Sequence, residues 1–410
     1  MKRMAIAALL FAPLVLSAPL PKNPKTVSSL VGKAVYPRSN GIYLRLGSPE
    51  SSQTINLTVL NGTVIADAGD WLEVEFSGKP GFLKRDEVVT VDEGIEYFSE
   101  QIAASKSVDL LIRRSAIYGV KREHDLALAD INAAIEMSPG PAMKLNRALI
   151  HVRRRDFERA LGDADDAVRT SPRYAAAHRI RGYVYGFLDQ YEDAIADYKK
   201  AVELNPDSPY DLINLAKAQY AAKDYEAALK SSDRAVVLND RQSDAHLERA
   251  RANAKLKRDD AAERDFRRAI ELMPKRGSAN AVRAGWRVEQ GRYDDANEDF
   301  LEATRRDPTE PSYMNARAWF LATCPDAKYR DGAVAKLYAT RANDIEKGNS
   351  PALLDTLAAA HAELGEFDEA IAAMKKAMAI PMLTKKEQSS FAVHLASFEA
   401  KKPWRKTPSP

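Results

Sequence analysis

The sequence predicts a mainly α-helical solenoid of about eight helix–turn–helix units plus caps, preceded by a small all-β module. Three observations lead to this prediction. A pattern of small and aromatic residues returns about every 34 residues through most of the chain. Residues 31–92 instead alternate polar and apolar positions between glycine turns. The whole chain has 410 residues, too many for one compact core.

Composition narrows the classes of function. The chain has 61 basic and 58 acidic side chains and a formal net charge of +3, so no global field attracts nucleic acid. We therefore expect no nucleic-acid partner. Its single cysteine, Cys324, cannot form an internal disulfide or a thiolate metal cage.

The amino terminus is typical of an export signal. Lys2 and Arg3 precede an apolar run from Met4 to Leu16, which at about 13 residues is shorter than the ~20 that cross a bilayer as a helix. Residues 1–17 are predicted to be a signal peptide cleaved after Ser17, with 18–30 as a linker. The mature chain then has no transmembrane helix and lies in the periplasm or at the cell surface. An uncleaved amino-terminal anchor is the alternative.

The 31–92 module is predicted to be a β-barrel. Its run GTVIADAGDWLEVEFSGKPGFLKRDEVV resembles the second half of a bacterial Src-homology-3-like barrel. The resemblance implies a ligand face with four aromatic candidates, which could equally be core: Tyr36, Tyr43, Trp71 and Phe82. Asp92-Glu93 could cap the next helix directly, so we expect the barrel to join the helices without a flexible linker.

The repeat is defined by alanines in one register. In each unit an alanine follows a turn, an aromatic or other large residue often comes four positions later, and a proline usually ends the second helix. Two helices that pack antiparallel need a small residue where they cross, which explains the alanine. The first spacing is 33 and the next four are 34: Ala127, Ala160, Ala194, Ala228, Ala262 and Ala296.

These residues resemble the tetratricopeptide repeat family over roughly Glu93 to Ile380. The resemblance implies a capping half-repeat helix at 93–106, an array at 107–380 and a capping helix at 381–401, followed by a disordered tail at 402–410. Two further units have their alanines at Ala335 and Ala370, and the interval of 39 residues from Ala296 to Ala335 predicts an insertion at Cys324–Tyr329 between the two helices of that unit. The stretch LATCPDAKYRDG resembles the closing repeats of exported bacterial, especially planctomycete, proteins of this family.

Patterns that would indicate catalysis are missing from the sequence. No glycine-rich turn is followed by Lys-Ser/Thr, and the six histidines form no helical pair around a carboxylate. Asp163, Asp165 and Asp166 do not converge on a helix, so we interpret them as a solvated face. The chain is predicted not to be an enzyme and to use no cofactor and no metal.

The first helix of each unit is expected to line a concave groove. Projection of the third to fifth units onto that face gives ten candidate residues for peptide binding: Arg179, Tyr183, Phe187, Tyr210, Ile213, Lys217, Tyr220, Leu247, Arg251 and Lys255. The four cations have no acidic partner in this set, which predicts a peptide that carries aromatic and acidic groups. Packing of some of these aromatics between units is the alternative.

Two classes of function remain open. The first is a non-catalytic adaptor of the bacterial cell envelope that binds protein or peptide partners in the groove. The second is a cell-wall protein, anchored to peptidoglycan or another glycan through the barrel. An accessory subunit of an enzyme is a third, weaker hypothesis.

Overall fold

The computed structural model describes residues 30, 33–38, 42–56, 62–76, 79–274, 276–381 and 383–405. The predicted signal peptide and all of the predicted linker except Leu30 lie outside these residues. The chain divides into two compact units, Met1–Ala134 and Ile135–Pro410.

The first unit begins with a curled antiparallel sheet. Its seven strands have the order β3-β2-β6-β5-β4-β1-β7, and β5 pairs with β6 from Trp71 to Phe76. Alternate apolar residues such as Leu72 and Val74 form its core. The sheet has the form of a half-barrel. The strands are β1 (Ala34–Pro37), β2 (Tyr43–Arg45), β3 (Thr54–Asn56), β4 (Gly62–Ala68), β5 (Trp71–Phe76), β6 (Lys79–Lys84) and β7 (Val88–Thr90).

The sheet passes into helices without a linker. Helix α1 (Val91–Ala104) follows β7 at once, with Thr90 as N-cap and Glu93 completing a capping box. Phe98 of α1 and Ile117 of α2 (Val108–Val120) are buried against the sheet. Helix α3 (His124–Met137) completes the first helical pair. The sheet and the first helices of this unit therefore share one apolar core.

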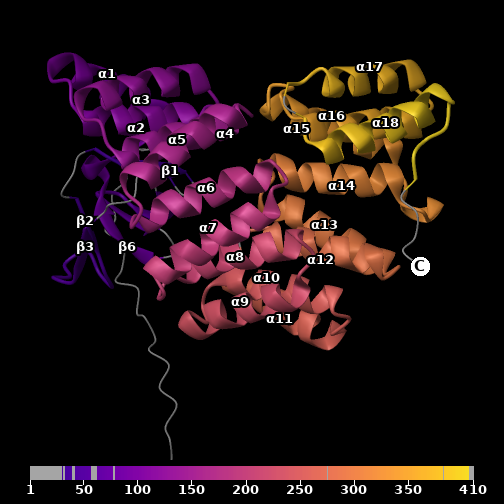
Figure 1. Ribbon diagram of the computed structural model, residues 1–410, viewed down its shortest axis with the longest axis horizontal. Helices are drawn as coiled ribbons and strands as arrows, with labels where there is room; N and C mark the ends of the chain where they lie inside the picture. The colour runs from indigo at the N-terminus through magenta and orange to yellow at the C-terminus, as the bar shows by residue number, and fades with distance from the viewer. Residues whose placement is uncertain are drawn as a thin grey trace, which may run out of the picture. The chain divides into compact units, whose positions relative to one another are not determined.

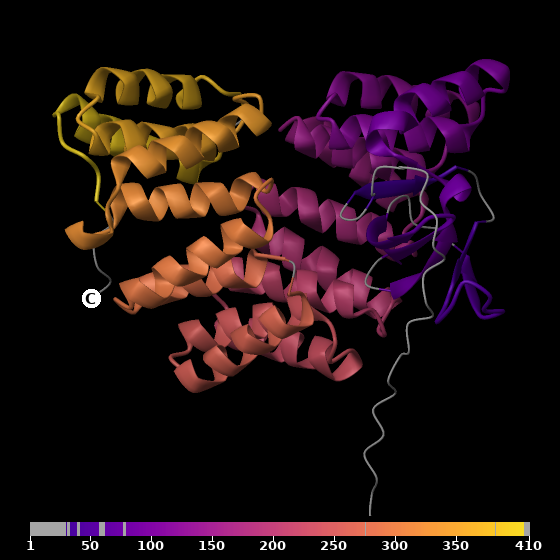
Figure 2. The same ribbon diagram turned by 180° about the vertical axis from the view of Figure 1, so that it is seen from behind.

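The second unit consists of stacked helix pairs (Figures 1 and 2). Short turns join the two helices of each pair, and a 3₁₀ turn at Ala327–Tyr329 fills the predicted insertion between α14 and α15. The helices are α4 (Pro141–Arg153), α5 (Phe157–Thr170), α6 (Ala175–Phe187), α7 (Tyr191–Leu204), α8 (Pro209–Ala221), α9 (Tyr225–Leu238), α10 (Ser243–Lys255), α11 (Asp259–Leu272), α12 (Ser278–Glu289), α13 (Tyr293–Arg306), α14 (Pro311–Thr323), α15 (Gly332–Ile345), α16 (Pro351–Glu363), α17 (Phe367–Met378) and α18 (Lys385–Glu399).

The repeating alanines lie where the helices cross. All eight, from Ala127 to Ala370, are at most 1% exposed. The aromatic residues four positions later, Tyr198, Phe266 and Phe300, are also buried. The predicted helical solenoid and its register are therefore confirmed.

In every pair except α14–α15, the turn between the two helices contains a residue with left-handed backbone angles. Five non-glycine residues have φ between 58° and 67° at this point: Arg122, Arg155, Asp189, Lys223 and Lys257. Glycine has this role in only two units, as Gly291 and Gly365. A side chain is strained in this conformation, so five turns use residues that fit it less well than glycine does.

The second unit curves in one direction. First helices of successive pairs contact each other, as α8 contacts α10 and α14 contacts α16, whereas second helices pack mainly on the first helices beside them. First helices that lie closer together line the inner face of a curved array. The inner face is thus formed by α4, α6, α8, α10, α12, α14 and α16.

Candidate binding face of the repeat array

Most helix pairs are held by one recurring ion pair, which we call the Arg–Asp staple. An arginine of the first helix donates from Nε and Nη2 to both oxygens of an aspartate 16 residues later, at 2.6–2.9 Å. Two parallel bonds fix the relative rotation of the two helices. The staples are Arg114–Asp130, Arg147–Asp163, Arg181–Asp197, Arg249–Asp265 and Arg283–Asp299.

The staple corrects the interpretation of the acidic cluster. Asp163 is buried and accepts from Arg147 instead of lying on a solvated face. Asp165 pairs with Arg181, and Asp166 pairs with Lys144 and Arg169. The three carboxylates face different cations, and within the described ranges no group of three potential ligands is placed to hold a metal ion.

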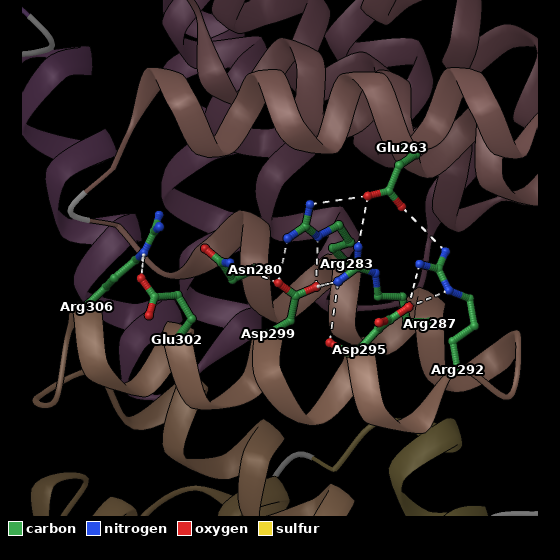
Figure 3. A network of polar contacts seen from close by, with 9 residues as sticks. All are labelled: Glu263, Asn280, Arg283, Arg287, Arg292, Asp295, Asp299, Glu302 and Arg306. Atoms are coloured by element: carbon green, nitrogen blue, oxygen red, sulfur yellow. Dashed lines mark hydrogen bonds and ion pairs between the residues drawn. The ribbon is translucent and has the colours of Figure 1, made fainter.

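One staple belongs to a larger polar network on α11, α12 and α13 (Figure 3). Arg287 donates to Asp299 at 2.8 Å and to Glu263 at 2.9 Å, and so joins two neighbouring units. Asn280 donates to the same aspartate at 3.0 Å. These charged side chains pair with one another inside the array. They therefore connect neighbouring repeats and do not form a ligand site.

The unit formed by α8 and α9 lacks the staple. Leu215 and Ser231 occupy the two positions, and Ser231 donates to Gln219 at 2.7 Å instead. Both members of the charged pair are therefore replaced together, which leaves neither charge behind.

Three of the four predicted groove cations have carboxylate partners, contrary to the expectation from sequence. Arg179 bonds Asp211 at 3.0 Å and Arg251 bonds Glu248 at 2.8 Å. Lys255 bonds Glu289 at 2.7 Å. Asp211 and Glu289 come from the first helix of the next pair, and Glu248 comes from the same helix as Arg251; none of the three was among the predicted groove residues. Burial raises the pKa of Glu248, although Arg251 opposes this.

Lys217 differs from these three cations. Its side chain is exposed on α8, and within the described ranges it forms no ion pair at contact distance, although its charge acts on the buried Glu248 and opposes the rise of the pKa of that carboxyl. It lies on the inner face between Arg179 and Arg251 in the order of the helices. A cation in this position is available to an acidic ligand.

The aromatic candidates divide into accessible and packed residues. Tyr183, Phe187 and Tyr210 are 43%, 37% and 49% exposed. Phe187 also stacks on Phe157 at 5.5 Å, so it packs between units as well. Tyr220 lies under Arg251, with 4.1 Å from the guanidinium carbon to the ring centroid. The accessible residues therefore form an aromatic and basic patch on α6 and α8.

Two aliphatic candidates are not available to a ligand. Ile213 and Leu247 are only 2% and 7% exposed, because they pack between successive helices. The sequence correctly placed both residues on first helices. However, successive first helices lie so close together that they bury these two side chains. They belong to the core of the array.

Sequence reasoning missed a hollow further along the inner face. It measures about 270 Å³ and lies between α12 and α14. Small residues at Ala281 and Gly285 form one wall, and Asn315 and Trp319 form the other. The Asn315 side-chain oxygen is buried and has no hydrogen-bond partner among the described residues. Small residues opposite a tryptophan on successive first helices were the signal that could have found it.

The four aromatics predicted on the amino-terminal module have different surroundings. Tyr36 is buried in the core between sheet and helices and cannot contact a ligand. Tyr43 is exposed and Phe82 is half-buried. Arg45 lies over the half-buried Trp71 ring at 4.7 Å. Trp71 also lines a hollow of about 850 Å³ with Arg38, Asp70, Lys84 and Arg85.

Two histidines and the single cysteine are buried inside the array. His178 and His246 lie 3.0 and 3.3 Å from the aspartates of their own staples. Cys324 is buried, and burial raises the pKa of its thiol. No helix in the described part of the chain is both long and apolar enough for a bilayer crossing.

Comparison with known proteins agrees with the observed repeat. Models described as tetratricopeptide repeat match residues 175–208, then 117–174, 213–277 and 287–322, and finally 352–380. Together they cover just over half of the chain. No curated protein matches it.

Solved structures also resemble the chain. One is a tetratricopeptide repeat protein from Parabacteroides merdae ATCC 43184, which is 18% identical. That match covers 72% of this chain and 100% of the other, with a TM-score of 0.45. Another is MamA, which is 22% identical over 37% of this chain and 90% of the other, with a TM-score of 0.32.

Proposed function

The chain belongs to the tetratricopeptide repeat family, and we propose that it is a non-catalytic scaffold that binds peptide segments of other proteins on the inner face of its array. Repeats of this family are generally protein-interaction scaffolds and typically non-catalytic. The observation that carries the proposal is the accessible patch of Tyr183, Tyr210 and Lys217 on α6 and α8. Exposed aromatics beside an exposed cation favour a peptide with aromatic and acidic side chains.

The location of the scaffold is part of the same proposal. Lys2 and Arg3, followed by the short apolar run, support export to the bacterial envelope. In that compartment the protein would hold envelope proteins together.

The test removes the patch and leaves the buried charges in place. Arg179 is kept, since its loss would leave the buried carboxylate of Asp211 without its cation. The variant combines Tyr183→Ala, Tyr210→Ala and Lys217→Glu. A matched control changes exposed residues on second helices: Val237→Ala, Leu301→Ala and Arg267→Glu.

The measurement is selection from a random-peptide display library on the wild-type protein, followed by fluorescence anisotropy. We expect enriched peptides that combine acidic and aromatic residues. Their affinity should fall at least about tenfold in the patch variant, because several contacts are lost together, and should not change in the control. Equal binding by wild type and patch variant would refute the proposed site.

A second function is favoured by the hollow beside Trp71. Its lining combines an aromatic ring with Arg38, Lys84 and Arg85, groups that suit the carboxylates and sugar faces of peptidoglycan or another glycan. Sedimentation of the full chain with purified cell-wall sacculi tests this function. Loss of sedimentation with Trp71→Ala would support it, and absence of sedimentation by the wild type would exclude it. Service as an accessory subunit of an enzyme would use the same inner face and has no separate observation in its favour.

A further inference from the structure

The described end of the chain returns to the inner face of the last units. Helix α18 ends at Glu399, and Lys401 has a left-handed φ of 52°. The Ser397 hydroxyl donates to the Lys402 carbonyl at 2.9 Å, and the Lys402 amide donates to the Ser397 carbonyl, also at 2.9 Å. These bonds reverse the chain after α18. The segment that follows, Pro403–Arg405, is called the strap below.

Two side chains of the strap, those of Trp404 and Arg405, pack against helices of the array. The ring of Trp404 lies 4.6 Å from that of His394 on α18 and 5.3 Å from that of Trp319 on α14. Arg405 donates to the Ala322 carbonyl at 3.3 Å and pairs with Glu363 at the end of α16. Trp404 and Arg405 thus contact the inner-face helices α14 and α16 and the last helix, α18; α16 packs against both of the others (Figure 1). The tail that sequence analysis expected to be disordered from residue 402 is placed through Arg405.

The strap fills only part of a longer depression. A second hollow of about 270 Å³ is lined by Trp404, Trp319, Asn315 and Asp355. It shares Trp319 and Asn315 with the hollow between α12 and α14. The two hollows therefore meet at one tryptophan and one asparagine, and the strap occupies one end. Asn315, with its buried and unpartnered oxygen, is suited to accept a hydrogen bond from the backbone of a bound peptide.

Removal of the strap would leave no buried charge unpaired. Glu363 also accepts from Arg330 at 3.1 Å, so it keeps a cation when Arg405 moves away. His394 keeps its contact with Asp355 at 2.7 Å. Because the partly exposed Glu363 keeps Arg330 and the buried His394 keeps Asp355, exchange of the strap for another ligand meets a small electrostatic penalty.

We infer that the strap is an intramolecular ligand, and that its slot between Trp319, His394 and Glu363 binds a partner peptide in which an aromatic residue is followed by a basic one. The chemistry of the partner is read from the occupant: an indole packed on two adjoining rings, whose centroids are 5.5 Å apart, and a guanidinium on a carboxylate. The strap competes with this partner and keeps the slot closed. The inference rests on the proposed function in that the inner face accepts peptides, but it concerns a different part of that face and a ligand of opposite charge.

The test uses the full-length chain and a fluorescein-labelled peptide with the sequence of residues 401–410. Anisotropy is measured for the wild type and for a strap variant with Trp404→Ala and Arg405→Ala. A tethered ligand competes at an effective concentration in the millimolar range, so the wild type should bind the peptide at least about tenfold more weakly than the strap variant. Addition of Trp319→Ala to the strap variant should abolish binding. Circular dichroism melts verify that each variant is folded.

Two results would overturn the inference. Equal binding by wild type and strap variant would show that the strap does not compete for the slot. Absence of binding by a folded strap variant would show that the slot is not a ligand site. Dimers of the wild type that increase with concentration and disappear with Trp404→Ala would support the slot with a second copy as partner. The patch variant of α6 and α8 keeps the slot intact, so failure of one test does not imply failure of the other.

Discussion

Replacement of Asp130 by serine removes the acceptor of one Arg–Asp staple. Arg114 and Asp130 are 19% and 7% exposed, and the guanidinium donates at 2.9 and 2.6 Å. Removal of one partner from a fully buried pair costs about 3–5 kcal/mol, while an exposed pair contributes about 0–1 kcal/mol. Arg114 keeps some contact with water and a bond to Ser99. We therefore expect a loss of about 2–3 kcal/mol in the free energy of unfolding of the α2–α3 pair.

The unit without a staple supplies the matched control. Leu215 and Ser231 take the place of the arginine and the aspartate there. The double variant Arg114→Leu and Asp130→Ser copies that arrangement and leaves no buried cation behind. It should cost about 1 kcal/mol or less, because an ion pair replaced by apolar packing is often nearly neutral.

The measurement is native-state amide hydrogen exchange in α2 and α3, supported by urea unfolding. Exchange reports the opening of each pair, which matters because a long repeat array does not unfold in one step. The reasoning is refuted if the double variant loses as much stability as the single one. A loss below about 0.5 kcal/mol for Asp130→Ser would also refute it, since that is the range of ordinary surface substitutions.

Two further predictions concern titration and reactivity. Burial disfavours the charge of Asp265, but hydrogen bonds from His246 and Arg249 outweigh it and lower the pKa below the usual 3.8. Its contribution to stability is therefore complete above about pH 5 and is lost as the pH falls through 3.8 and below. In urea unfolding between about pH 6 and 3, Asp265→Asn should weaken this acid dependence, and an unchanged slope would contradict the assignment. Cys324 is 2% exposed and burial raises its thiol pKa. The native protein should thus react with a disulfide reagent about a hundredfold more slowly than the urea-unfolded chain, whereas equal rates would contradict its burial.

The repeat register was predictable because it depends on local rules. An alanine at a helix crossing and a proline at a helix end have the same meaning in every unit, and all the predicted alanines are buried. The insertion after Cys324 was visible as a break in the period, and it forms a 3₁₀ turn. The half-barrel sheet was indicated by period-two alternation between glycine turns in residues 31–92.

The partners of charged groups were less predictable. The four groove cations were compared only with other predicted groove residues, whereas Asp211 and Glu289 pair with Arg179 and Lys255 from the first helix of the next pair. The staple had a visible signal, an arginine and an aspartate 16 residues apart in most units. It was missed because Asp163 was considered with its sequence neighbours and not with its counterparts one period away.

The strap had no periodic signal at all. Trp404 and Arg405 lie in a short polar tail that has the composition of a disordered segment. Only the placement of Trp319, His394 and Glu363 on three different helices creates their binding site. Contacts between segments far apart in the sequence are not encoded in a local pattern.

The non-glycine residues at the left-handed turns are sites where substitution could stabilise the protein. Lys223 and Lys257 are exposed and have φ of 67° and 59°. Glycine adopts such angles without strain, which can relieve about 1 kcal/mol at each turn. Sites one period apart act almost independently, so the gains should add. Glycine substitutions at these turns should therefore stabilise the array without any change to the candidate binding residues.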